Sequence, residues 1–213
     1  MKKTITAAVL SSALLLGACS ESSVREDLNS VLNDTLAAEE EYLNVQSELE
    51  ELEQSEQQMF ESVMALTQEE MKEVNELSAE ALASVEERLA LLETEKESIA
   101  AAAEQFEEID SVIAEAEDEA IISELEALKT VMEERYAAHQ TFIAEYEELA
   151  VLQNELYNLL GDEETDLEQL QEQTTLVNEQ NEAVLTSVEA FNQKTEEFNT
   201  LKNSIIEQLE EEE

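Results

Sequence analysis

Four residues in the second half of the chain, Arg135, Tyr136, His139 and Tyr146, combine a fixed positive charge, a titratable imidazole and two phenols. His139 follows Arg135 by four positions, so in a helix the two side chains share one face. Such a group could form a polar pocket in which Arg135 clamps an anion and His139 responds to pH. The alternative, which we favour, is structural: Arg135 pairs with acidic residues of a neighbouring helix, and His139 fills a satisfied polar layer.

Most kinds of catalytic site are excluded, because the chain has too few of the residues that they require. Zinc sites need three or four suitable ligands and di-iron bundles need two Glu-x-x-His motifs, but the chain has one His and one Cys. Phosphate-binding loops need several glycines, and only Gly17 and Gly161 occur. We therefore expect a non-enzyme with no catalytic residue, metal or cofactor, apart from divalent cations that could bridge to a ligand. Chance pairs among 55 acidic residues leave a glycosidase-like site open.

The single cysteine, Cys19, follows a leader-like segment. Residues 1–3 give a positive start, and residues 4–16 form an apolar run of 13, which is too short to span a membrane but fits a signal-peptide core. The segment Leu16-Gly17-Ala18-Cys19 resembles the bacterial lipobox. That resemblance implies cleavage between Ala18 and Cys19 and a diacylglycerol thioether on the Cys19 sulfur, with N-acylation, for example by palmitate, as a further modification.

The alternative for this segment is an ordinary signal peptide, with Cys19 as a bystander. Leu16 fits an ordinary cleavage site poorly, which favours lipidation. Two acyl chains give stable anchoring, so the mature chain is expected on the outer face of the cytoplasmic membrane, facing the cell wall. With no second cysteine, the chain has no intramolecular disulfide.

The net charge of −45 restricts the partners. Nucleic-acid binders and proteins held by anionic lipids need clusters of Lys or Arg, and 10 basic against 55 acidic residues provide none. We therefore expect no nucleic-acid partner, and membrane contact only through the lipid on Cys19.

The composition and the apolar spacing predict an all-α protein. Pro is absent and Gly occurs twice, while Glu, a good helix former, is abundant. Apolar residues recur at spacings of four and three, which is typical of coiled-coil-like seams. We expect an elongated antiparallel up-and-down bundle of four long helices. The predicted segments are a leader (1–18), a tether (19–22), a bundle (23–210) with helices at about 24–66, 68–116, 119–160 and 166–210, and an acidic tail (211–213).

Capping signals set these boundaries. Capping boxes are predicted at Ser23 with Glu26, at Thr67 with Glu70 and at Thr165 with Glu168. Gly161 is expected as a left-handed cap of the third helix. The junction between the second and third helices is placed near residues 117–119, where charges interrupt the seam, and one continuous helix is the alternative there.

The chain resembles the YkyA-like cell-wall-binding lipoproteins of Gram-positive, Bacillus-type bacteria. The similarity rests on the lipobox ending at Cys19, on Glu134-Arg135-Tyr136-x-Ala138 followed by Tyr146, and on residues 167–173, Leu-Glu-Gln-Leu-Gln-Glu-Gln. It implies a helical-bundle lipoprotein on the outer face of the cytoplasmic membrane, and it supplies no catalytic residues.

Three functional classes follow. The first is a non-enzymatic surface lipoprotein whose bundle binds a wall polymer or another surface protein. The second is an extracytoplasmic adaptor or chaperone-like protein, and the third is a wall hydrolase that uses a Glu pair. Because teichoic acids and the chain are both negative, direct wall binding would need bridging cations, high salt or a neutral ligand. The ligand and the oligomeric state are left open.

The acidic excess predicts a salt-dependent fold, because like charges repel within the compact state and salt screens them. We expect the melting temperature of a soluble form lacking residues 1–19 to rise with sodium chloride concentration. Thermal melts followed by circular dichroism measure this, and a melting temperature that stays flat with salt would contradict it.

Overall fold

The computed structural model describes residues 17–211, which form helices joined by short turns. The helices are α1 (Gly17–Ala38), α2 (Glu40–Ala65), the 3-10 turn η1 (Gln68–Glu70), α3 (Met71–Phe106), α4 (Ile109–Glu115), α5 (Glu119–Gly161) and α6 (Leu167–Glu211). No strand occurs between residues 17 and 211, and the predicted all-α class is confirmed. Residues 1–16 of the predicted leader and residues 212–213 of the tail lie outside the described part.

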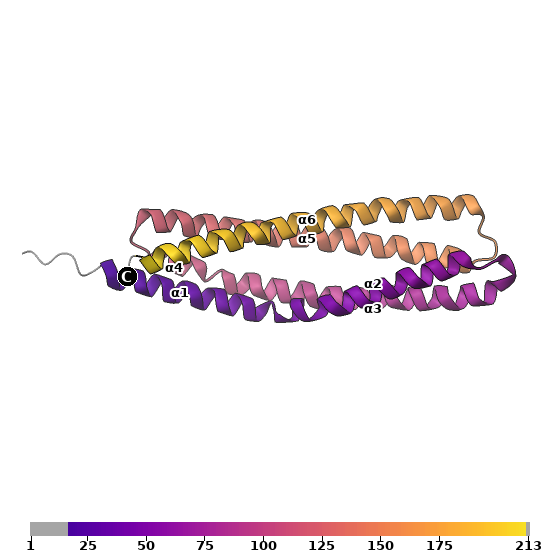
Figure 1. The fold of residues 1–213 in the computed structure, drawn as a ribbon, viewed down its shortest axis with the longest axis horizontal. Coiled ribbons are helices and arrows are strands. Elements are labelled where there is room, and N and C mark those ends of the chain that lie inside the picture. The colour runs from indigo at the N-terminus through magenta and orange to yellow at the C-terminus, as the bar shows by residue number, and fades with distance from the viewer. Residues whose placement is uncertain (1–16, 212–213) are drawn as a thin grey trace, which may run out of the picture.

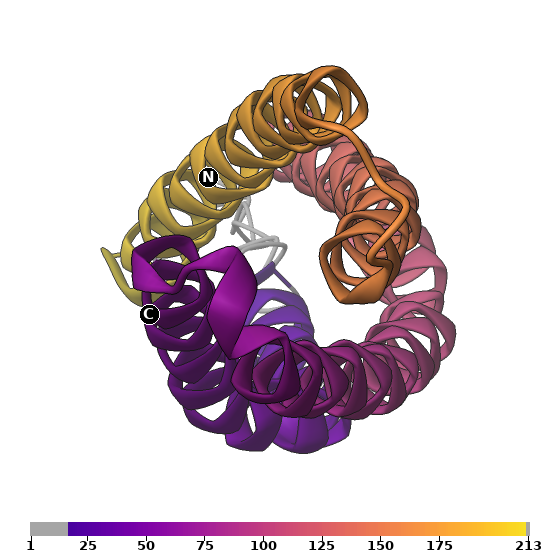
Figure 2. The ribbon, with the colours of Figure 1, turned by 90° about the vertical axis from the view of Figure 1, so that its right-hand side faces the viewer.

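The helices form an elongated bundle of four rods (Figure 1). The first rod is α1 with α2, the second is α3 with α4, and α5 and α6 are the third and fourth. Along the chain α3 packs on α2, α5 on α3 and α6 on α5, which is the predicted up-and-down order. The 45 residues of α6 make a rod of about 68 Å. Figure 2 views the bundle from the end that holds the α2–α3 turn and the α5–α6 loop.

The first predicted helix, 24–66, is broken at Glu39 into α1 and α2. In an unbroken helix the Tyr42 N–H would donate to the Ala38 carbonyl. Instead Ser98 of α3 lies between them: its hydroxyl accepts from the Tyr42 N–H at 3.1 Å and donates to the Ala38 carbonyl at 2.7 Å. A side chain inserted into the ladder kinks a helix, and α1 and α2 run at a visible angle in Figure 1.

Other boundaries differ from the predicted ones by a few residues. The second rod breaks after Phe106, so that the predicted helix 68–116 comprises η1, α3 and α4. The third rod begins at Glu119, near the predicted junction, where the Asp118 carboxylate accepts the N–H groups of Ala120 and Ile121. The observed junction excludes one continuous helix.

Of the three predicted capping boxes, one is observed as predicted. The Glu70 carboxylate accepts the N–H and the hydroxyl of Thr67, and these bonds lower the pKa of Glu70. The box at Ser23 is wrong, because α1 already begins at Gly17. At α6 the reciprocal bonds join Asp166 to Gln169, one residue later than the predicted pair.

Gly161 does not have the predicted left-handed cap conformation. It is the last residue of α5, and its φ is not positive. A Cβ at this position would lie 3.0 Å from the Asn75 side-chain oxygen on α3. The glycine therefore serves the close approach of α5 to α3, and the turn itself begins at Asp162 with extended backbone.

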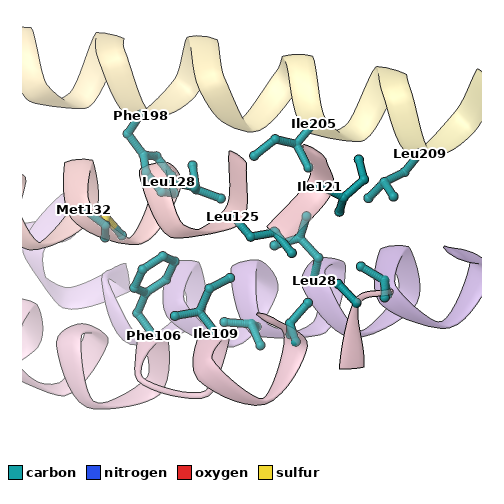
Figure 3. Packing of buried hydrophobic residues seen from close by; sticks show 14 of the residues in the cluster. Leu28, Phe106, Ile109, Ile121, Leu125, Leu128, Met132, Phe198, Ile205 and Leu209 are labelled. Atoms are coloured by element: carbon teal, nitrogen blue, oxygen red, sulfur yellow. The ribbon is translucent and has the colours of Figure 1, made fainter. Parts of the chain in front are cut away.

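The largest apolar core lies at the α1 and α4 end of the bundle (Figure 3). It joins Leu28 of α1, Ile109 of α4, Leu125 of α5 and Ile205 of α6, all fully buried. Two smaller clusters lie in the other half, around Leu92 and around Val85. Buried charged residues lie among these apolar clusters, and these charged residues belong to the site described next.

Candidate binding groove and its polar network

The four residues singled out in the sequence all lie on α5 and are buried. Their exposed fractions are 5% for Arg135, 8% for Tyr136, 2% for His139 and 4% for Tyr146. They do not face one common pocket. Each of the three strongly polar residues, Arg135, His139 and Tyr146, has its own set of partners on other helices.

Arg135 pairs with Glu39, the residue at which the first rod is broken. Its guanidinium donates to both carboxylate oxygens of Glu39, at 2.6 and 3.0 Å, and its Nε donates to the Thr195 hydroxyl at 3.0 Å. The guanidinium also lies 4.8 Å from the centre of the Phe191 ring and 5.8 Å from that of Tyr136. These contacts match the structural alternative for Arg135, a pair with an acidic residue of a neighbouring helix.

His139 lies in a polar layer lined with aromatic rings. Its Nε2 is 2.8 Å from Glu95, whose other carboxylate oxygen accepts from Gln46. The rings of Tyr42 and Phe191 lie within 6.2 Å of the imidazole, and they contact each other edge-on at 6.1 Å. Because Tyr42 belongs to α2 and Phe191 to α6, this layer joins the first and fourth rods at the middle of the bundle.

Tyr146 belongs to a third network, centred on Arg88 of α3. Arg88 donates to the Tyr146 hydroxyl at 2.7 Å, to Gln153 at 2.8 Å and to Glu56 in a short ion pair. Glu56 also accepts from Tyr157 at 2.9 Å. Both members of the ion pair are almost fully buried, so each charge depends on the other.

A second bond of Tyr146 and the effect of burial complete this network. The Tyr146 hydroxyl donates to Glu53 at 2.6 Å. Burial raises the pKa of Tyr146 and of Tyr157, so both phenols stay neutral and act as hydrogen-bond donors. Burial also raises the pKa of Glu56, although Arg88 and the Tyr157 hydroxyl oppose the shift.

Arg88 was not among the candidate residues identified from the sequence, although it is almost fully buried. One signal that could have identified it is the small number of arginines. The chain has three, and two of them, Arg88 and Arg135, are buried. Glu56 was visible as an acidic residue on the apolar seam of the first rod. An acidic residue at such a position indicates a cationic partner on another rod.

Beside this network a groove of about 1030 Å³ runs between α2 and α6. Side chains of α5, with Arg88 of α3, form its floor. Of the four predicted residues, Tyr146 lines this groove. Its buried apolar side chains include Leu149, Leu156 and Val184, while Leu43 on the α2 edge and Leu185 on the α6 edge are about half exposed.

The buried polar groups beside the groove form a closed hydrogen-bond network. Its buried charges and phenols are bonded to one another, as described for Arg88, Glu56 and Tyr146. Within residues 17–211 no cluster of three His, Cys, Asp or Glu is arranged to hold a metal ion. None of the helices in the same range has the length and apolar character of a membrane span.

Cys19 lies in the first turn of α1. Helix α1 lies in the half of the bundle opposite the α2–α3 turn (Figure 1). The groove begins at Leu43 on α2 and extends toward that distal turn. The groove therefore lies in the half of the first rod that is farther from the predicted lipid site.

Comparisons with known proteins agree with this architecture. A family profile described as "Putative cell-wall binding lipoprotein", YkyA, matches residues 23–208. The "Uncharacterized lipoprotein YkyA" of Bacillus subtilis is 29% identical over 193 residues, which is 91% of this chain and 86% of that protein. A crystal structure of a conserved Staphylococcus aureus protein of unknown function has the same fold, with a TM-score of 0.74 at 14% identity, covering 88% of this chain and 93% of that one.

The buried pair of Arg88 and Glu56 predicts a strong stability effect. Arg88→Met leaves the Glu56 carboxylate unpaired, so we expect a loss of about 3–5 kcal/mol in the free energy of unfolding. The double variant Arg88→Met/Glu56→Leu removes both charges and should recover much of that loss. Urea unfolding of the soluble form measures both.

The surface pair of Lys72 and Glu76 provides the control, since both side chains are largely exposed. Lys72→Met should change the urea midpoint little. If Arg88→Met behaved like Lys72→Met, the buried network would not contribute to stability as described.

Proposed function

Since the chain belongs to the YkyA family, described as "Putative cell-wall binding lipoprotein", we propose that it is a lipid-anchored, non-enzymatic protein of the cell surface. The anchor is diacylglycerol on Cys19, and the location is the outer face of the cytoplasmic membrane. The helical bundle extends from there and binds a wall polymer through the groove between α2 and α6.

One observation carries this proposal: the groove lies far from the lipidated end. At 1.5 Å per residue, Leu43 and Phe60 are about 36 Å and about 62 Å along the first rod from Cys19. Both residues line the groove. A lipid at Cys19 would thus hold one end of the bundle at the membrane and present the groove in the wall space.

The absence of catalysis is supported by the state of the groove's polar groups. A hydrolase needs one carboxylate that can give a proton and another that attacks or activates water. Glu56 is committed to Arg88 and Tyr157, and Glu53 accepts from Tyr146. Their hydrogen bonds tie both carboxylates to the fold, which favours binding over hydrolysis.

The net charge decides how a wall polymer could be held. Anionic polymers are repelled by a chain of net charge −45, unless divalent cations bridge the two. Neutral glycan strands are compatible with the amide and apolar side chains of the groove, such as Asn178, Asn181 and Val177. A surface protein is the alternative ligand, and the adaptor class from the sequence analysis corresponds to it.

Anchoring is tested by Cys19→Ser in the full-length chain expressed in a Bacillus-type host. We expect wild-type protein in the membrane fraction and the variant outside it, because the acyl chains supply the membrane affinity. Immunoblots of membrane and soluble fractions measure this. A variant that remained with the membrane to the same extent would contradict lipid anchoring at Cys19.

Wall binding is tested by co-sedimentation of the soluble form with isolated cell wall, with calcium or with a chelator. We expect retention that falls when the groove variant Leu185→Asp is used, and not when Leu36→Asp is used. Leu36 is exposed to a similar extent, 58% against 50% for Leu185, but does not line the groove. No retention in either condition would reject wall binding, and release of soluble sugar fragments would reject the non-enzymatic assignment.

A further inference from the structure

We propose that the groove between α2 and α6 binds one face of a basic amphipathic helix contributed by another surface protein. The inference rests on the proposed function in that it takes this groove as the binding surface, and it assigns the groove to the alternative ligand named there, a surface protein, in place of a wall polymer. It rests on four properties of the groove: an uncovered apolar seam, its length, a closed inner end and the charge of its walls.

The apolar seam of α6 is covered in one half of the bundle and uncovered in the other. Toward its C-terminus α6 packs on α1 and α5, and Phe198, Ile205 and Leu209 are buried there. The same helix continues into the groove with Val177 and Val188, which are only partly buried, and with the half-exposed Leu185. A helix of a partner protein, lying beside α2, would cover these side chains, as α1 covers the C-terminal part of the α6 seam.

The length of the groove matches a short helix. It is lined over residues 43–60 of α2, 142–157 of α5 and 174–188 of α6. At 1.5 Å per residue these stretches span about 21–26 Å, which corresponds to a helix of about 14–17 residues. An amphipathic helix that lays its apolar face in a groove is a common mode of peptide recognition.

The groove is closed at its inner end. Tyr42 of α2 contacts Phe191 of α6 edge-on, and His139 lies behind both rings. These rings stop a ligand from continuing toward the α1 end. The outer end of the groove extends toward the α2–α3 turn and the α5–α6 loop.

The charge of the walls selects a basic occupant. Helix α2 contains eight Glu and neither Lys nor Arg, and α6 has no Lys or Arg before Lys194. Glu50 and Glu53 line the groove itself. Lysines flanking the apolar face of a partner helix would meet these carboxylates. A second copy of this chain is disfavoured, because it would bring the same acidic excess.

The probe is a synthetic peptide of about 16 residues, made of Leu and Lys, with Leu at helical positions i, i+3, i+4 and i+7. Two control peptides are needed: one with the same Leu positions and Glu in place of Lys, and one with the Leu/Lys composition but no apolar face. We expect the mature chain with Cys19→Ser to bind the first peptide only, as measured by calorimetry at physiological salt.

Matched variants locate the binding. Leu43→Asp/Leu185→Asp should weaken binding at least about tenfold, whereas Leu36→Asp/Val151→Asp, at exposed positions outside the groove, should not. Glu50→Lys should weaken binding more than Glu87→Lys, although both change the net charge equally. Circular dichroism confirms that each variant is folded.

Binding that ignores the Leu43 and Leu185 substitutions, or that is equal for the peptide without an apolar face, overturns the inference. So does a concentration-dependent dimer that Leu185→Asp dissociates, because a second copy would then be the occupant. The peptide-binding assay contains no cell wall, so peptide binding and wall binding can be rejected independently. Loss of peptide binding leaves wall retention standing, and loss of wall retention leaves peptide binding standing.

Discussion

The hydroxyl of Ser98 occupies the place of one backbone hydrogen bond in the first rod, and the shape of the bundle follows from it. By bonding to both Ala38 and Tyr42 it separates α1 from α2. On either side of the break the first rod packs on α3, but only α1 also packs on α4 and α6. One edge of the bundle is therefore closed along α1 and open along α2, and the open edge is the groove.

Buried charge imposes the second constraint. The two buried arginines each need a carboxylate, and each takes one from the first rod: Arg135 takes Glu39 at the break, and Arg88 takes Glu56 within α2. Unpaired, any of these groups would be costly to bury. The pairs thus fix the register of α1 and α2 against α3 and α5, and the Arg88–Glu56 pair beside the groove is formed without a ligand.

The sequence predicted the architecture well because its information is local and periodic. Seams at spacings of four and three define helices, and the Thr67 box and the charges near residue 118 mark two of the turns. The break at Glu39 has no such signal. Its cause is Ser98, about 60 positions away, and a serine within a helix does not reveal which backbone it will contact.

The candidate site was predicted only in part, because its contacts also join residues that are far apart in the sequence. Arg135 and His139 stood out as rare polar residues on an apolar seam, and the structural alternative correctly described their kind of partner. Arg135 contacts Glu39, His139 contacts Glu95, and Tyr146 contacts Arg88. Which partner each residue meets depends on how the rods are rotated about their axes. The periodicity of one helix does not determine that rotation relative to its neighbours.

Whether the edge between α2 and α6 is open can be tested with a pair of cysteines placed across the groove. Gln57 and Asn178 line opposite walls of the groove. In the soluble form lacking Cys19, Gln57→Cys/Asn178→Cys can form a disulfide only if the two Cα atoms come within about 7 Å. If the edge is open, both thiols stay free under mild oxidation. Near-complete formation of an intramolecular disulfide would show a closed bundle and contradict the open edge.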